Sequence, residues 1–394
     1  MYDVWSMPAE QSVRDVIRNS LQYGPLSFRD FMELALYHPE LGYYARAENP
    51  VGKGGDYVTA PSLSPVFAFA IARLFREFVA RCEGEVCSFV DIGCGDGGLV
   101  RAVAALIEDE KVRFFGVDRA AEGRWQSAEG RRKGPGMAEA FCALPSALCP
   151  PSFFRTLDEV PRDGAHFIFS SELYDAIPFA RLVRRGEHLH ELDVVERDGG
   201  LDWSEHEASA AYDDYFAERG IELAEGQFAD VALEWEAFHE DVARFVRRGL
   251  IVTLDYGYTS QKLFHPRARR FGTAAAYSGH RVHRDLLSDP GEQDLTAHIN
   301  FSDLERAGER QGAKTLFFDV LAKFLLSIGV TEHELFKPVH EVEIASADEG
   351  IALMGAREEA RRMILPDGMG EDLRVLVQGK DVSFENWSFQ RPLF

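Results

Sequence analysis

The sequence CSFVDIGCGDGG at residues 87–98 joins an apolar run, an acid at Asp91 and a cluster of glycines. A short apolar run bounded by turn residues is typical of a buried parallel strand. The apolar residues that follow within 99–107 recur at helical spacing. We therefore predict a strand, a glycine-rich loop and a helix, in which the loop lets the backbone approach a ligand and the helix directs free N–H groups toward it.

The glycines fit a dinucleotide-binding loop. Gly93, Gly95 and Gly98 match the pattern G-x-G-x-x-G. A second apolar run at residues 112–117 is followed by Asp118, where an acid that binds ribose hydroxyls is expected. This spacing makes NAD one candidate ligand.

The same residues also fit a second cofactor. The series Asp91-x-Gly93-x-Gly95-x-Gly97 resembles the first motif of S-adenosylmethionine (SAM) methyltransferases, in which the acid lies near the methionine moiety of the cofactor. A glycine-rich turn without a ligand is the less favoured interpretation, because strand, loop, helix, second strand and terminal acid occur in the required order. The loop alone leaves both NAD and SAM open.

The composition is that of a folded protein with an acidic surface. The 394 residues are 46% hydrophobic, which supplies ample material for a core, and the length is compatible with two or three structural units. Lys and Arg number 43 against 65 Asp and Glu, a formal net charge of −22. This excess disfavours a nucleic acid or an anionic membrane as the main partner and favours a basic protein or small cation, although an acidic surface also serves solubility.

Neither a disulfide framework nor a zinc site is predicted, because the five cysteines form no C-x-x-C pair and their number is odd. Residues 1–15 contain acids and no apolar segment of a signal peptide, and no apolar run reaches the length of a membrane span. We therefore expect a cytoplasmic protein without membrane insertion or a metal site. The sequence makes no prediction of an oligomeric state.

The N-terminal part predicts two helices followed by a long loop. Residues 13–21 have helical periodicity, and Ser27 with Asp30 is typical of a cap that opens a second helix through Tyr37. Residues 38–65 are aromatic and glycine-rich, with neither helical nor alternating periodicity. A segment of that length without periodicity in a globular protein is usually functional, so we expect a packed loop rather than a flexible linker.

Several sequence blocks resemble one protein family. GKGGDYVTAPSLSPVF at residues 52–67 resembles the N-terminal signature of the complex I assembly-factor-7 family (also called the mitochondrial dysfunction protein A family), SAM-dependent methyltransferases of mitochondria and bacteria. Four further blocks match in order: SSELYDAIPF at 170–179, LDYGY at 254–258, YSGHRVHRDLLSDPGEQDLTAHINFSDL at 277–304 and MGEDLRVL at 369–376. The resemblance covers nearly the whole chain.

The resemblance implies an α/β fold with a Rossmann-like, seven-stranded class I methyltransferase sheet, an N-terminal helical cap and large insertions. It implies SAM as cofactor and an arginine of a partner protein as acceptor, with a respiratory complex I subunit as candidate. The expected cofactor-binding residues are Asp91, Gly93, Gly95, Gly97 and Asp118, together with Asp56, Thr59 and Pro61 from a loop at 52–64 that we expect to cover the cofactor.

Two domains are expected. Residues 1–80 would form the cap and the cofactor-covering loop, and residues 81–394 the methyltransferase domain, with insertions at about 179–240 and 258–312. The further predicted elements are an apolar helix from Pro65 to about Val79, strands within 167–169, 250–254, 315–318 and 373–377, a hairpin within 179–205, and helices at 212–219 and 233–247.

Three acids that follow predicted strands are the candidates for catalysis. Glu172 and Asp175 come after the run at 167–169, and Asp255 follows the run at 250–254, so all three are expected at the carboxyl edge of the sheet. An arginine acceptor is protonated at neutral pH, and a carboxylate would hold it by charge-assisted hydrogen bonds and accept its proton. Helix capping is an equal alternative for Asp175, and bonding to loop amides is the favoured alternative for Asp255.

Histidines 280, 283 and 298 are interpreted as hydrogen-bonded loop residues rather than metal ligands, because arginines intervene and no cysteine lies nearby. Two other functions remain as alternatives. An NAD-dependent oxidoreductase would use the same glycine loop, but no Lys, Tyr or His proton donor follows a dehydrogenase spacing. A non-catalytic assembly chaperone would use the cofactor site only for stability.

Overall fold

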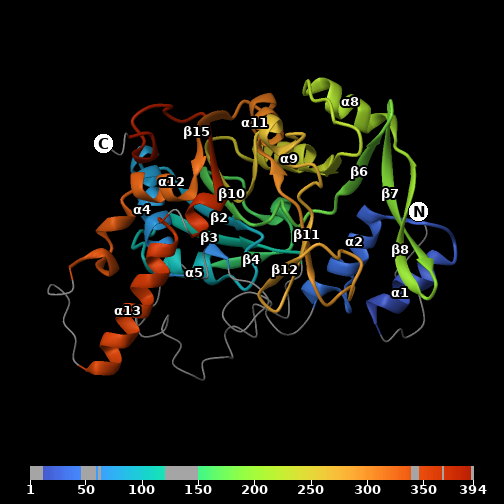
Figure 1. Ribbon diagram of the computed structural model, residues 1–394. Helices are drawn as coiled ribbons and strands as arrows, with labels where there is room; N and C mark the ends of the chain where they lie inside the picture. The colour runs from blue at the N-terminus through green and yellow to red at the C-terminus, as the bar shows by residue number, and fades with distance from the viewer. Residues whose placement is uncertain are drawn as a thin grey trace. The chain divides into compact units, whose positions relative to one another are not determined.

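The chain folds into two compact units, each assembled from three stretches of sequence (Figure 1). The computed structural model describes residues 12–45, 59–60, 64–119, 150–338, 346–365 and 368–391. Unit 1 comprises residues 1–57, 174–235 and 257–303, and unit 2 comprises 58–173, 236–256 and 304–394. The expected ranges were 1–80 and 81–394. The observed division differs from them, for example in placing helix α4 (Pro65–Arg81) in unit 2.

At the centre of unit 2, seven strands of an eight-stranded sheet form the series β4-β3-β2-β5-β10-β16-β15. Its strands are β2 (Cys87–Ile92), β3 (Val112–Val117), β4 (Ser152–Phe154), β5 (Ala165–Ser171), β10 (Gly249–Tyr258), β15 (Lys314–Val320) and β16 (Leu373–Lys380). Strand β16 runs in the opposite direction to the other six strands of this series, which are parallel to one another. This arrangement confirms the predicted Rossmann-like α/β fold, and the chain order reverses between β2 and β5.

Apolar helices cover both faces of the sheet in unit 2, and each central strand is therefore buried on both sides. Phe89 and Phe167 pack with helix α4 and with α5 (Gly98–Ala105), whereas the alternate residue Val90 packs on the other face with α9 (Glu234–Phe245). Burying one phenylalanine contributes about 1.5–3 kcal/mol. These rings therefore stabilise the sheet more than the exposed ion pairs do, each worth about 0–1 kcal/mol.

Unit 1 contains two antiparallel sheets. One runs β1-β7-β6-β9 with β8 paired to β7, and the other runs β12-β11-β13. Their strands are β1 (Leu26–Ser27), β6 (Ala180–Arg185), β7 (His188–Arg197), β8 (Gly200–Glu207), β9 (Phe228–Val231), β11 (Ala275–Ser278), β12 (Arg281–His283) and β13 (Asp294–Thr296). The predicted hairpin at 179–205 is thus part of a three-stranded meander.

The helices of the N-terminal part follow their sequence signals. Helix α1 spans Val13–Leu21 and α2 spans Phe28–Tyr37, where the Ser27 side chain accepts a hydrogen bond from the amide of Asp30, 3.1 Å away, as predicted. The other helices are α8 (Ala210–Glu218), α10 (Ser260–Leu263), α11 (Phe301–Arg310), α12 (Leu321–Ser327), α13 (Ala347–Arg362) and α14 (Met369–Asp372). None of the helices in the described part of the chain is long and apolar enough to cross a membrane.

Short elements complete the connections. Strand β14 (Ile299–Asn300) pairs in parallel with the last two residues of β10. Single-turn 3-10 helices lie at Tyr43–Ala45, Leu157–Glu159, Val330–Glu332, Glu334–Phe336 and Ser388–Gln390.

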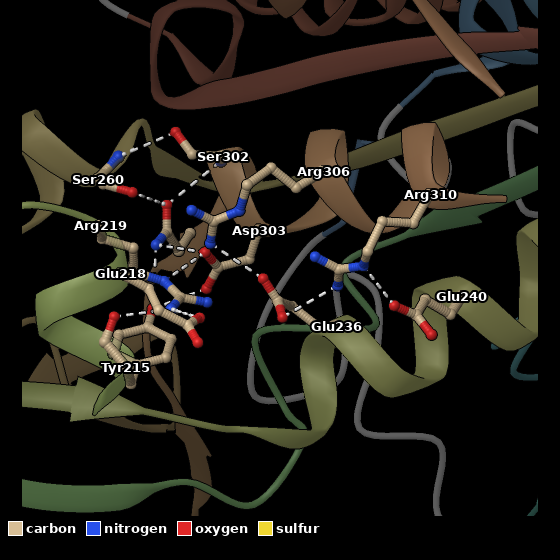
Figure 2. Close-up of polar contacts among 11 residues, drawn as sticks. Tyr215, Glu218, Arg219, Glu236, Glu240, Ser260, Ser302, Asp303, Arg306 and Arg310 are labelled. Carbon is tan, nitrogen blue, oxygen red and sulfur yellow. Dashed lines mark hydrogen bonds and ion pairs between the residues drawn. The ribbon is translucent and has the colours of Figure 1, made fainter. Parts of the chain in front are cut away.

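A buried polar cluster in unit 1 explains part of the long block at 277–304. Asp303 accepts hydrogen bonds from the Tyr215 hydroxyl at 2.7 Å, from Arg219 Nε at 2.8 Å and from Asn300 Nδ2 at 2.9 Å (Figure 2). The side chains of Arg219 and Asp303 are 2% and 0% exposed. Since every charge in it is paired, the cluster joins α8 to the start of α11 and has a structural role.

Candidate active site

The candidate site lies where β2 and β5 end in unit 2. Ile92 pairs with Ser170 in the parallel register, so the glycine loop after β2 and Glu172 after β5 leave the sheet side by side. Leu173 confirms this proximity, because its Cδ1 lies 2.9 Å from the position that a Cβ on Gly93 would take. Ligands of open α/β sheets bind at such a reversal of strand order.

The loop that follows β2 requires glycine at three positions. Gly93, Gly95 and Gly97 have φ angles of +75°, +55° and +75°, a region that other residues rarely adopt. A Cβ on Gly97 would overlap the ring of Phe153. A Cβ on Gly95 would meet no atom of the described residues within 4 Å, so this part of the chain leaves room for a ligand at Gly95.

Two acids belong to this loop region. Asp118, directly after β3, accepts a hydrogen bond from the amide of Gly95 at 2.9 Å, so the acid predicted to bind the ribose contacts the loop. Asp91 lies in β2 and is 4% exposed. Burial, and then the charges of Asp118 and Asp96, raise the pKa of the Asp91 carboxyl well above its ordinary value. A bound cation at this point would favour the ionised carboxylate, which suits a positively charged cofactor.

Glu172 adopts a strained conformation at the end of β5. Its φ is +50°, a conformation that costs a non-glycine residue about 1–2 kcal/mol. Its amide donates to the Leu254 carbonyl at 2.9 Å, and its Oε1 accepts a hydrogen bond from the Ala60 amide at 3.0 Å. The carboxylate is therefore held in place by Ala60 of the block at 52–67, next to Thr59. The expected site residues Asp56 and Pro61 lie outside the described residues.

Asp255 and Asp175 differ from Glu172 in their surroundings. Asp255 is fully buried in β10, and its carboxylate accepts the amides of Leu173 at 3.2 Å and Tyr256 at 2.8 Å. This arrangement positions Leu173 beside the glycine loop. Asp175 belongs to unit 1, where its backbone carbonyl accepts a hydrogen bond from the Ala297 amide at 3.0 Å.

Two apolar residues next to the loop were not among the predicted site residues. Phe153 lies against Gly97 and against Gly116, and the guanidinium of Arg101 lies 4.8 Å from its ring centre. Leu173 lies against Gly93. The only sequence signal for Leu173 was its place directly after Glu172. Phe153 lies in β4, which is too short to show the alternating pattern of a strand. In the described part of the chain, no three His, Cys, Asp or Glu side chains are grouped to hold a metal ion.

Comparisons with known proteins give a consistent result. Residues 70–318 match the model of a family described as S-adenosyl-L-methionine-dependent methyltransferase. Two relatives bear the name protein arginine methyltransferase NDUFAF7, mitochondrial. The protein of Danio rerio is 24% identical over 310 residues (73% of this chain, 69% of the relative), and that of Homo sapiens is 24% identical over 353 residues (81% and 77%).

A solved structure extends the similarity to the complete fold. A protein from Burkholderia thailandensis, crystallised with S-adenosyl-homocysteine, matches with a TM-score of 0.80 at 26% identity, covering 98% of this chain and 97% of that one. A second crystal structure from the same organism matches with a TM-score of 0.76 at 26% identity, covering 97% and 96%.

Proposed function

This chain belongs to the family of S-adenosyl-L-methionine-dependent methyltransferases, and on that premise we propose that it methylates an arginine of a partner protein. Membership of the family gives the reaction, methyl transfer, and the cofactor, SAM. The names of the NDUFAF7 relatives support arginine as the acceptor. The resemblance of residues 52–67 and 277–304 to the complex I assembly-factor-7 family supports a respiratory complex I subunit as the partner.

The residues around the glycine loop fit the cofactor. SAM supplies an electrophilic methyl group on a positively charged sulfur. The loop of Gly93, Gly95 and Gly97 would hold the cofactor, with Asp118 at the ribose hydroxyls and the buried carboxyl of Asp91 close to the positive charge. Displacement at a methyl group depends mainly on placing the acceptor in line, so positioning supplies most of the catalysis.

We propose that the block at 52–64 covers the cofactor, with Asp56, Thr59 and Pro61 in or next to the site. The hydrogen bond from the Ala60 amide to Glu172 supports this, because it fixes the end of the block at the carboxyl edge of the sheet.

The carboxylate of Glu172 carries the proposal of an arginine acceptor. A guanidinium remains protonated at neutral pH, so the site must accommodate it next to the positive sulfonium. A carboxylate at that point compensates the charge, orients the guanidinium by charge-assisted hydrogen bonds and accepts its proton. The strained backbone and the Ala60 contact keep Glu172 at the reversal of strand order without the acceptor bound.

Glu172→Gln tests this role, because the amide keeps the length of the side chain and removes the charge. We expect affinity for S-adenosyl-homocysteine to remain nearly unchanged by calorimetry, and protein arginine methylation to fall about a hundredfold or more. Methylation is measured with labelled SAM and a cell lysate, followed by localisation of the label by mass spectrometry.

Glu83→Gln is the matched control. Glu83 also has φ +50°, but it is exposed in the turn after α4, so its replacement should leave methylation at the wild-type rate. Normal methylation by Glu172→Gln, or label on lysine or on a small molecule, would contradict the arginine assignment. If the wild-type protein bound S-adenosyl-homocysteine but transferred no methyl group, the chaperone alternative would be favoured.

A further inference from the structure

A basic stretch stands out in this acidic chain. Residues 256–284 contain six Lys and Arg and no Asp or Glu, although the whole chain has a net charge of −22. The six are Lys262, Arg267, Arg269, Arg270, Arg281 and Arg284, and none of them forms an ion pair with a carboxylate of the described residues. The chain has more acids than bases, yet the charged residues in this stretch of unit 1 are all basic. Positive charge is therefore concentrated here.

One part of the stretch, the basic loop at residues 265–271 (HPRARRF), contains several backbone hydrogen bonds. The His265 ring nitrogen accepts the amides of Arg267 and Ala268 at 3.3 and 3.2 Å, and its carbonyl accepts the amide of Arg269 at 2.9 Å. Phe271 ends the loop with 62% of its surface exposed. A hydrogen-bonded backbone thus carries three arginines just before an exposed aromatic residue.

Neighbouring arginines enlarge the positive surface. Arg270 Nη2 and Arg185 Nη1 lie 3.4 and 3.9 Å from the same point, the position of a Cβ on Gly226. Arg181 donates to the Phe271 carbonyl at 3.2 Å. The acids Glu205 and Asp230 pair with Arg185 and Arg181. Arg270 donates to the Glu225 carbonyl at 3.1 Å and the Arg269 guanidinium lies 4.7 Å from the centre of the Tyr258 ring, but among the described residues no carboxylate pairs with Arg267, Arg269 or Arg270.

We propose that the basic loop docks an extended acidic segment of the protein substrate, with an apolar side chain of that segment against Phe271. The inference rests on the proposed function, in which the acceptor is a protein. Exposed guanidiniums match carboxylates by paired hydrogen bonds, and an exposed aromatic residue beside them is typical of a protein contact.

Two other ligand classes fit less well. A small anion makes no use of Phe271. A nucleic acid extends its charge beyond the loop and would meet the repulsion of a chain with net charge −22. A short acidic segment contacts only the basic loop and avoids that repulsion.

The test compares two triple variants of the full chain by fluorescence anisotropy. The probe is a fluorescein-labelled peptide of Asp and Glu with one central Leu. Arg267→Gln/Arg270→Gln/Phe271→Ser removes two guanidiniums and the ring of the basic loop, and should weaken peptide binding about tenfold or more. Arg281→Gln/Val282→Ser/Arg284→Gln is the matched control, because it removes two unpaired arginines and a side chain that is also 62% exposed. It should bind the peptide like the wild type.

Calorimetry with S-adenosyl-homocysteine separates the possible failures. Both variants should bind it with unchanged affinity, which shows that they are folded. Equal weakening of peptide binding by both variants, equal binding of a peptide with Asn and Gln in place of the acids, or tighter binding of a single-stranded oligonucleotide would overturn the docking proposal. Absence of S-adenosyl-homocysteine binding by the wild type would instead overturn the proposed function.

Discussion

We propose Gly95 as the residue at which an added side chain most strongly affects cofactor binding. Its φ is +55° and no atom of the described residues lies within 4 Å of a Cβ at this position, so Gly95→Val would place a branched side chain where we propose that the cofactor binds. We expect calorimetric titration to show no binding of S-adenosyl-homocysteine by this variant. If the folded variant binds it with wild-type affinity, the glycine loop is not the cofactor site.

Gly186 provides the control for backbone strain. It has φ +57° in the turn between β6 and β7, and a Cβ there also meets no atom of the described part of the chain within 4 Å. Gly186→Val should therefore lose the same stability, about 1–2 kcal/mol, and retain S-adenosyl-homocysteine affinity.

Asp91 makes stability depend on pH in the ligand-free protein. Burial raises the pKa of its carboxyl above the ordinary value of 3.8. An acid whose pKa is higher in the folded state favours folding most below that ordinary value, and this contribution is lost as the pH rises through the folded-state pKa. At neutral pH, Asp91→Asn should therefore unfold at a higher urea concentration than the wild type.

The measurement is a series of urea titrations of both proteins between about pH 4 and pH 8. The advantage of Asp91→Asn should shrink toward the acid end, because there both folded proteins carry an uncharged side chain at this position. A difference that does not change with pH would show that Asp91 titrates normally.

Helix α11 shows how burial changes the value of an ion pair. At its start, Asp303 pairs with Arg219, both fully buried in unit 1, and further along, Arg306 pairs with the more exposed Glu236 in unit 2 (Figure 2). Asp303→Asn leaves the buried guanidinium with only the exposed Glu218 as charge partner, 3.7 Å away, and should lower the free energy of unfolding by about 3–5 kcal/mol. Glu236→Gln should cost only about 0–1 kcal/mol. Denaturant titrations followed by circular dichroism compare the two, and equal losses would refute this assignment.

At the scale of the whole molecule, the proposed cofactor site belongs to unit 2, around the glycine loop and the end of the block at 52–64. Adding S-adenosyl-homocysteine should slow hydrogen exchange in peptides that cover residues 52–64 and 93–98, for amides that exchange by local opening. The strands β7 and β8 of unit 1 serve as the internal control and should exchange as before. Unchanged exchange at 52–64 would leave that segment with a structural role only.

Net charge is likewise a property of the whole molecule that does not describe each surface. The value of −22 argues against a polyanionic main partner, yet the basic loop has three arginines without acidic partners among the described residues. An overall charge therefore predicts long-range attraction, while local docking depends on how the charges are distributed.

Local sequence patterns were sufficient for most of the fold. The apolar run at 112–117 is β3, the run at 373–377 lies within β16, and Ser27 caps α2, because strand burial and helix capping depend on residues close together in the chain. Helix α13 was not predicted, and its exposed Ile351 and Met354 explain why, since they interrupt the apolar stripe of a helix packed on a core.

The sequence by itself determined the parallel sheet, the glycine loop after β2 and the acids at the strand ends. Only the tertiary structure decided which groups contact these acids. Glu172 and Asp175 are three residues apart but belong to different units, whereas Ala60, 112 residues before Glu172, donates to its carboxylate. The physical reason is that hydrogen bonds and desolvation act over a few ångströms in space. They depend on how distant segments pack, which the spacing of residues along the chain does not specify.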